Sequence, residues 1–295
     1  DEQHRFGVNQ RLSLTQRGLN EVTPHQLTMT ATPIPRTLSM VAYADLDCST
    51  IDELPPGRKP ITTVLIDNER RQSVIERVGN ACQQGRQAYW VCALIEESEA
   101  LDANAAEVTA EQLTEALPNL RIGLLHGRVS SQEKAAIMAA FANGDLDILV
   151  ATTVIEVGVD VPNASLMIIE NAERFGLAQL HQLRGRVGRG AVESHCLLMY
   201  QSPLSQTARD RLTVMRESQD GFVLAEKDLE IRGPGEVLGT RQTGVSSFRV
   251  AQLPEHDYLL EEAQAMASNI VSADSARAEK IEQRWTRTLE AFAHV

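Results

Sequence analysis

Apolar runs alternate with helical patterns along the chain from residue 60 to residue 200. A short apolar run bounded by turn residues predicts a buried strand, whereas apolar residues three or four positions apart over a longer stretch predict a helix. Helical stretches lie between most of the apolar runs, and one of them, SQEKAAIMAAFANG, ends on a glycine, a frequent stop signal. The expected strands cover residues 61–67, 87–94, 121–127, 146–153, 164–171 and 194–200.

Strands that alternate with helices predict a parallel β-sheet covered by helices on both faces, so the expected fold class is α/β. Sheets of this kind bind ligands at the carboxyl ends of their strands. Binding residues are therefore expected directly after the predicted strands.

The flanks of this region follow other patterns. Residues 54–60, LPPGRKP, are typical of a linker. Before them, HQLTMTATPI predicts one strand and TLSMVAYA one helix, which is too little for an independent domain. After residue 200, a helix at 205–218 precedes a polar, glycine-rich stretch at 221–247 and two further helices. We expect three regions: residues 1–56 as the remnant of another domain, 57–200 as the sheet domain, and 201–295 as a helical extension made of a helical hairpin with a loop and then C-terminal helices.

The charge of the chain does not exclude nucleic acid. It carries 28 basic and 40 acidic residues among 295, a formal net charge of −12. Net charge governs solubility and non-specific attraction, so a local basic patch can still bind phosphate. Four basic residues are lysines and 24 are arginines (28 − 4), and the planar guanidinium suits bidentate contacts with phosphate. Biased codon usage explains the same excess equally well.

The sequence gives no sign of export or membrane insertion. It has no charged-then-apolar leader and no run that approaches about 18 apolar residues. Its four cysteines form no C-x-x-C pair, so neither a zinc site nor a disulfide framework is indicated. These features predict a cytoplasmic protein in a reducing compartment.

Two adjacent carboxylates open the chain in the string DEQH. At a strand end, Asp1 is suited to hold Mg²⁺, and Glu2 to orient or deprotonate an attacking water. A polar loop or a helix start, where acidic residues are favoured, is the alternative. Downstream, TMTATPIPRT predicts a strand that two prolines stop abruptly. Thr30 and Thr32 on that strand are placed to hydrogen-bond the carboxylate site.

A second candidate lies in ILVATTVIEVGVDVPNA, at residues 148–164. The buried strand ends in Thr152 and Thr153, whose hydroxyls and amides are suited to contact a phosphate backbone. Gly158 and Asp160 follow on a short turn, which places a carboxylate near a domain cleft. Taken alone, the segment also fits a strand that ends in an ordinary turn.

Arginines and glycines mark the segment QLHQLRGRVGRG, at residues 179–190. Its apolar spacing predicts a helix that continues through the segment, and Gln182, Arg186 and Arg189 then share one face. Gly185 and Gly188 each lower helix stability by about 1 kcal/mol relative to alanine, which suggests that something approaches the backbone closely. An arginine that reaches a γ-phosphate accelerates phosphoryl transfer, whereas a solvated helix face is the alternative. The predicted buried stripe consists of Leu177, Leu180, Leu183 and Val187.

These segments, in this order, resemble motifs II, III, V and VI of superfamily-two helicases over residues 1–200, and AYWVCALIEESE and LLHGRVSSQEK look like the intervening second-lobe motifs. The resemblance implies two RecA-like lobes with ATP in the cleft between them. Residues 1–56 would then be the remnant of the first lobe and residues 57–200 the second lobe. In this resemblance, the nucleotide site is formed by Asp1 and Glu2 of the first lobe and by Asp160, Arg186 and Arg189 of the second. Gln3 and His4 would couple the nucleotide state to lobe movement. The residues that would contact the nucleic-acid backbone are His126, Arg128, Thr152 and Thr153.

Residues 220–244, DGFVLAEKDLEIRGPGEVLGTRQTG, are similar to a translocation motif shared by replication-fork remodelling helicases and the transcription-repair coupling factor. Without that resemblance the stretch is typical of a charged, glycine-broken loop. With it, Arg211, Arg232, Arg241 and Gln242 become candidates for converting lobe closure into movement on duplex DNA.

The resemblance implies an ATP-dependent DNA helicase or translocase of the fork-remodelling kind, with ATP and Mg²⁺ as cofactors. Its expected substrates are stalled forks and branched recombination intermediates, including Holliday junctions, in DNA repair and recombination. We expect a bacterial, nucleoid-associated cytoplasmic monomer, with branched double-stranded DNA as partner, single-strand-binding protein as a further partner, and no membrane.

The sequence contains no G-x-x-x-x-G-K-[ST] loop, which such enzymes need to cradle the triphosphate. We therefore expect the chain to correspond to the C-terminal part of a longer helicase and to be inactive by itself. Two alternatives stay open: the transcription-repair coupling factor, and a non-catalytic module that binds DNA.

Overall fold

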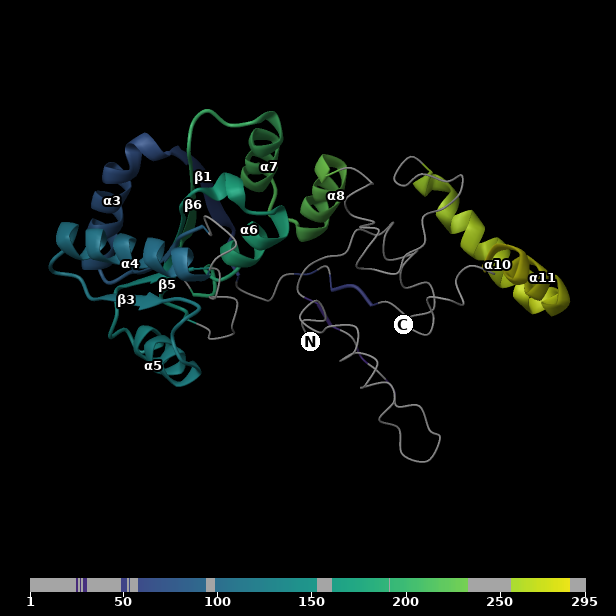
Figure 1. Ribbon diagram of the computed structural model, residues 1–295, viewed down its shortest axis with the longest axis horizontal. Coiled ribbons are helices and arrows are strands. Elements are labelled where there is room, and N and C mark those ends of the chain that lie inside the picture. Colours follow the sequence, from purple (N-terminus) through teal and green to yellow (C-terminus); the bar gives the residue numbers. More distant parts are fainter. Residues whose placement is uncertain are drawn as a thin grey trace. The chain divides into compact units, whose positions relative to one another are not determined.

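The computed structural model divides into two compact units, of which the first lies mostly in Pro55–Leu224 and the second mostly in Ala225–Val295. The ribbon in Figure 1 follows the chain through both units. The structure describes residues 25, 27, 29, 30, 49–51, 53, 58–93, 99–152, 161–190, 192–232 and 256–286.

The first unit is built on a six-stranded sheet with the strand order β1-β6-β5-β2-β4-β3. Every paired strand runs parallel to its neighbour, which confirms the predicted α/β fold. The strands are β1 (Ile61–Asp67), β2 (Gln87–Val91), β3 (Ile122–Leu125), β4 (Ile148–Ala151), β5 (Ala164–Ile169) and β6 (Ser194–Tyr200). Its helices are α3 (Arg71–Gln83), α4 (Glu99–Ala116), α5 (Ser131–Ala142), α6 (Leu177–Arg184) and α7 (Gln206–Glu217). The next helix, α8 (Gly221–Arg232), begins in this unit and continues past its end at Leu224.

The central strands are apolar on both faces because helices cover both. Trp90 of β2 lies in a buried cluster with apolar residues of α3 and α4, among them Val78 and Leu113. The next residue towards the amino end, Tyr89, points to the opposite face, where its ring meets Phe141 of α5 edge-on at a centroid distance of 4.9 Å. A strand buried on both sides reads as a continuous apolar run, which is why these strands are visible in the sequence.

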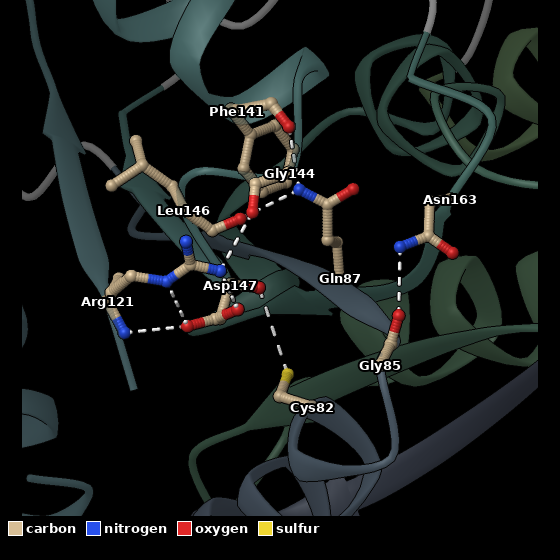
Figure 2. A network of polar contacts seen from close by, with 9 residues as sticks. All are labelled: Cys82, Gly85, Gln87, Arg121, Phe141, Gly144, Leu146, Asp147 and Asn163. Carbon is tan, nitrogen blue, oxygen red and sulfur yellow. Dashed lines mark hydrogen bonds and ion pairs between the residues drawn. The ribbon is translucent and has the colours of Figure 1, made fainter. Parts of the chain in front are cut away.

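Polar contacts tie the loops at the amino ends of β2, β3 and β4 together (Figure 2). The buried Gln87 amide donates to the carbonyls of Phe141 at 2.6 Å and Leu146 at 2.7 Å. Arg121 pairs with Asp147, with 2.8 Å between Nη2 and Oδ1, and also donates to the Gly144 carbonyl at 2.7 Å. These contacts fix the end of α5 against the sheet, at the edge opposite the expected binding edge.

Two predicted features are wrong in detail. The helix expected to run through residues 179–190 ends at Arg184, because Gly185 is its C-cap and Gly188 adopts a positive φ of 81°. The stretch 221–247, expected to be a loop, begins with the helix α8. Asp220 starts that helix, since its carboxylate accepts the Phe222 N–H at 2.8 Å.

The described part of the second unit includes two consecutive helices, as predicted: α10 (Leu260–Ala273) and α11 (Ser275–Thr286). Asp274 joins them, and its carboxylate accepts the Arg277 N–H at 3.0 Å. Val271 is 63% exposed and Ile281 is 41% exposed, so apolar side chains of this unit face outward. Within the described residues, none of the helices combines the length and the apolar character that a membrane span requires.

Candidate nucleotide and nucleic-acid site

The turn after α6 carries the two predicted phosphate-binding arginines. The Arg186 N–H donates to the Leu183 carbonyl at 3.0 Å, which starts the turn directly after the helix. Arg186 is half-buried, whereas Arg189 is exposed and its Nε donates to the Gly185 carbonyl at 3.4 Å. Gln182 lies on α6 itself and is half-buried. The two arginines therefore share a turn, and not a helix face with Gln182.

Glycines shape this turn because the chain approaches itself there. A Cβ added at Gly188 would lie 2.9 Å from Cγ1 of Ile61, at the start of β1. A Cβ added at Gly190 would lie 2.2 Å from the carbonyl oxygen of Pro162. The close approach that the sequence suggested is thus made, at least in part, by the protein's own backbone and side chains.

Arg184, which the sequence analysis did not single out, is the most enclosed charged residue of this region. It is 2% exposed, and its Nη1 donates to the carbonyls of Met215 and Ser218, both at 2.8 Å. A third, longer contact of 3.4 Å joins Nη1 to Oγ1 of Thr63. Burial lowers the pKa of the guanidinium from its usual value. The signal was present in the sequence, because Arg184 stands seven residues after Leu177 and so falls on the apolar face of α6.

His181 receives a contact from the same guanidinium. Nη2 of Arg184 donates to Nδ1 of His181 at 3.1 Å. Burial, followed by the charges of Arg184 and Arg58, lowers the pKa of His181 to about 4. The imidazole is therefore neutral at pH 7, which leaves Nδ1 able to accept the hydrogen bond.

Two predicted nucleic-acid contacts lie at the carboxyl edge of the sheet. His126 follows β3 and is 9% exposed, and its Nε2 lies 3.5 Å from Oε1 of Glu107. Its Nδ1 is buried without a hydrogen bond among the described residues. Thr152 follows β4, is 3% exposed, and donates its N–H to the Leu125 carbonyl at 3.2 Å. Arg128, in the turn that follows His126, is exposed.

A half-buried carboxylate, which the sequence prediction also missed, stands at this edge. Glu170 follows β5, and its Oε1 accepts from Nε of Arg71 at 2.7 Å and from Nε1 of Trp90 at 3.0 Å. The Arg71 guanidinium also lies over the Trp90 ring, 5.8 Å from its centroid. The three side chains come from β1–α3, β2 and β5, so they join the ends of separate strands.

Arg211, a predicted translocation residue, is tied to the main chain of a neighbouring turn. Its Nη1 donates to the carbonyls of Phe175 at 3.1 Å and Glu173 at 3.4 Å. These contacts join α7 to the turn that leads into α6. Arg232 is the last residue of α8, and its side chain lies outside the described residues.

Many of the predicted site residues lie outside the part of the chain that the structure describes. Thr30 is described and exposed. Within the described residues, no group of three or more His, Cys, Asp or Glu side chains is placed to hold a metal ion. The predicted residues outside the described part are Asp1, Glu2, Gln3, His4, Thr32, Thr153, Gly158, Asp160, Arg241 and Gln242.

Comparison with known proteins agrees with this architecture. Residues 69–191 match the model of the helicase conserved C-terminal domain. The parallel sheet with its flanking helices is thus that of a RecA-like helicase C-terminal lobe. Residues 218–290 match the model of the ATP-dependent DNA helicase RecG, domain 3, C-terminal. The chain belongs to the RecG family.

Relatives and a solved structure support this assignment. The chain is 62% identical over its whole length to the ATP-dependent DNA helicase RecG of Escherichia coli strain K12, and it spans 43% of that protein. It is 51% identical to the protein of the same name from Streptococcus pneumoniae, over 93% of the chain and 40% of the relative. A solved structure of RecG bound to a three-way DNA junction shares 48% identity with a TM-score of 0.63, over 78% of this chain and 30% of that one.

Proposed function

We propose that this chain supplies the second RecA-like lobe and the translocation region of a RecG-type ATP-dependent DNA helicase that remodels branched DNA. The observation that carries the proposal is the turn after α6, which holds Arg186 and Arg189 and packs beside the start of β1 in a RecA-like sheet domain. Because the chain spans 43% of its Escherichia coli relative, the activity proposed is that of the full-length protein.

In this proposal Arg186 and Arg189 reach the γ-phosphate of ATP bound between the two lobes. When bound, ATP supplies the phosphoryl group whose transfer to water drives the cycle. A guanidinium at that position stabilises the charge that develops during transfer. Gln182, on the preceding helix, is assigned the coupling of this site to the presence of nucleotide. Asp160 and Gly158 complete the second-lobe face of the cleft.

The first lobe contributes the remaining chemistry in the proposal. Asp1 holds Mg²⁺, Glu2 orients the attacking water, and Gln3 and His4 transmit the nucleotide state. The hydroxyls of Thr30 and Thr32, on the strand predicted next to this site, hydrogen-bond the carboxylates of Asp1 and Glu2. The metal is assigned through the residue type of Asp1, a hard oxygen ligand of the kind that Mg²⁺ prefers.

DNA is proposed to run along the carboxyl edge of the sheet. Arg128 and Thr152 lie there, with Thr153 next in sequence, and arginine, hydroxyl and backbone N–H groups are the usual partners of phosphate oxygens. His126 follows β3 at the same edge and is 9% exposed, so we assign it the support of that edge as well as a backbone contact. A solved RecG structure contains a three-way junction, and we propose branched duplex DNA as the substrate here. We further propose a cytoplasmic, nucleoid-associated monomer that meets single-strand-binding protein at forks.

The first test removes Arg189 from a full-length protein that carries this chain. Arg189→Ala should lower ATP turnover by about 10³-fold or more, since a phosphate-reaching arginine contributes roughly that much, while DNA binding stays largely intact. Arg77→Ala, which removes an exposed arginine from α3, is the matched control and should leave turnover unchanged. Normal hydrolysis by Arg189→Ala would show that the phosphate-reaching role is wrong.

The second test concerns translocation in the same full-length protein. Arg232→Ala and Gln242→Ala should each keep DNA-stimulated hydrolysis and lose fork unwinding, because they are proposed to convert lobe closure into movement. Hydrolysis is followed by phosphate release and unwinding by strand displacement from a fork. If a variant loses both activities together, its residue belongs to folding or to the nucleotide site instead.

A further inference from the structure

Arg184 links two elements that the proposed function treats separately. It ends α6, so it stands directly before the turn that carries Arg186 and Arg189. Its side chain points the other way, to the end of α7. The guanidinium donates to the carbonyls of Met215 and Ser218 at 2.8 Å each. One residue is therefore bonded to both the phosphate-facing turn and the start of the translocation region.

The acceptors are the orphan carbonyls of a helix C-terminus. α7 ends at Glu217 with Ser218 as its C-cap, and the last carbonyls of a helix have no N–H partner of their own. They also carry the negative end of the helix dipole, which a cation stabilises. Directly after them, Asp220 caps the start of α8. Arg184 thus holds the corner between α7 and α8, which we define as Met215–Gly221.

The contacts of the Arg184 guanidinium are expected to be rigid because the side chain is buried. Arg184 is 2% exposed, and its contacts with Thr63 of β1 and His181 of α6 add to the two carbonyl contacts. A buried charge is costly to leave without partners, so the guanidinium and its acceptors are expected to move as one body. A solvated side chain would instead exchange its partners for water.

We propose that Arg184 is a positioning residue that carries a displacement of the Gly185–Arg189 turn to the corner between α7 and α8. This inference rests on the proposed function, because it assumes that the turn moves when nucleotide binds or is hydrolysed. In that cycle Arg184 touches neither ATP nor DNA. Arg184 couples ATP hydrolysis to DNA unwinding, so its replacement should leave hydrolysis in place while unwinding is lost.

The test measures base pairs unwound per ATP hydrolysed in a full-length protein that carries this chain. Arg184→Lys keeps the positive charge, but a single ammonium cannot reproduce the fork that spans two carbonyls, a hydroxyl and an imidazole. We expect DNA-stimulated hydrolysis to stay within about twofold, whereas the coupling ratio falls at least about fivefold, as typical coupling energies imply. Ser205→Ala is the matched control, because it removes the cap at the other end of α7 and leaves the Arg184 contacts intact.

Several outcomes would overturn the inference. If the number of base pairs unwound per ATP is unchanged in Arg184→Lys, or falls equally in Ser205→Ala, then the contacts of Arg184 with the end of α7 have only a structural role. Lost hydrolysis in Arg184→Lys would place the residue in the nucleotide site. By contrast, an unmodified protein without any DNA-stimulated hydrolysis would refute the proposed function itself, so the two failures are distinguishable.

A second measurement needs no variant. Amide hydrogen exchange reports local opening, and the corner contains measurable N–H groups, such as that of Ser218, which donates to the Val214 carbonyl at 2.9 Å. We expect exchange across residues 215–224 of the unmodified full-length protein to change when a non-hydrolysable ATP analogue is added. Identical exchange with and without the analogue would overturn the inference even if Arg184→Lys does not fold.

Discussion

His181 lies one helical turn before Arg184 and shares its enclosed surroundings. A histidine in the unfolded chain has a pKa of about 6.5, whereas burial and the nearby arginines lower the pKa of His181 to about 4. Between these two values the unfolded chain binds more protons than the folded one. The contribution of the neutral imidazole to stability is therefore complete above pH 6.5 and is lost as the pH falls towards 4.

His181→Gln should remove this part of the pH dependence. We expect the free energy of unfolding, measured by urea titration, to fall less steeply between pH 6.5 and 4 in the variant than in the unmodified chain. The glutamine amide keeps an acceptor for Arg184 and cannot titrate. If the free energy of unfolding falls equally steeply with pH in the variant and in the unmodified chain, then His181 does not cause this pH dependence. His256→Gln, a change outside the first unit, is the control and should leave the slope unaltered.

Long-range contacts are what a single sequence hides. The contacts that Arg184 makes with Met215, Ser218 and Thr63, and those that Glu170 makes with Arg71 and Trp90, join residues 31 to 121 positions apart, and no local spacing reveals them. Arg186 and Arg189 were found because glycines flank them, and glycine near an arginine is visible in any sequence. Their placement on a helix was wrong, because a helix and the tight turn that follows it present the same apolar spacing over one further turn.

At the scale of elements, the strands were the easiest features to predict. β1 and β6 match the predicted segments at residues 61–67 and 194–200, because strands of a parallel sheet are rich in apolar residues. The helix α8 was missed since its mixture of charged and apolar residues precedes a glycine-rich segment, and the pattern was averaged over both. The start of α8 is set by an N-terminal cap, because the Asp220 carboxylate accepts the Phe222 N–H.

Gln87 joins two elements and gives the sharpest prediction at this scale. It is 3% exposed at the start of β2, and it bonds the carbonyls of Phe141 and Leu146 at the two ends of the loop after α5. Gln87→Leu keeps the volume and removes this donor. The Phe141 carbonyl still accepts the Gly144 N–H at 3.1 Å, whereas the Leu146 carbonyl loses the Gln87 amide. An unsatisfied buried acceptor costs about 1–3 kcal/mol, so we expect a loss of about 1–3 kcal/mol in the free energy of unfolding.

Chemical denaturation of the chain measures this loss directly. Gln72→Leu, which makes the same substitution at an exposed position of α3, controls for the added apolar side chain and should change stability by less than about 0.5 kcal/mol. If Gln87→Leu is as stable as its control, then the loop after α5 is held by the Arg121–Asp147 pair and the core alone.

At the scale of the whole molecule, the formal charge of −12 and the proposed binding of DNA are compatible. Acidic residues spread over the surface raise solubility, whereas a DNA contact needs only a local group of arginines and backbone N–H groups along one edge. Affinity for duplex should therefore weaken with salt in proportion to the few phosphates contacted. Salt-dependent binding that nucleotide does not alter would favour the alternative of a non-catalytic module.

The last prediction concerns the chain by itself. Its sequence contains no G-x-x-x-x-G-K-[ST] loop, and the arginines after α6 form only one wall of the proposed nucleotide site. We expect no DNA-stimulated ATP hydrolysis from these 295 residues alone, at a protein concentration where the full-length protein turns over readily. Phosphate release with and without branched duplex is the measurement, and Arg189→Ala in the same chain is the control for a contaminating ATPase. Turnover that the chain shows and its Arg189→Ala variant lacks would mean that one lobe binds and hydrolyses ATP unaided, and the division of the site between two lobes would have to be abandoned.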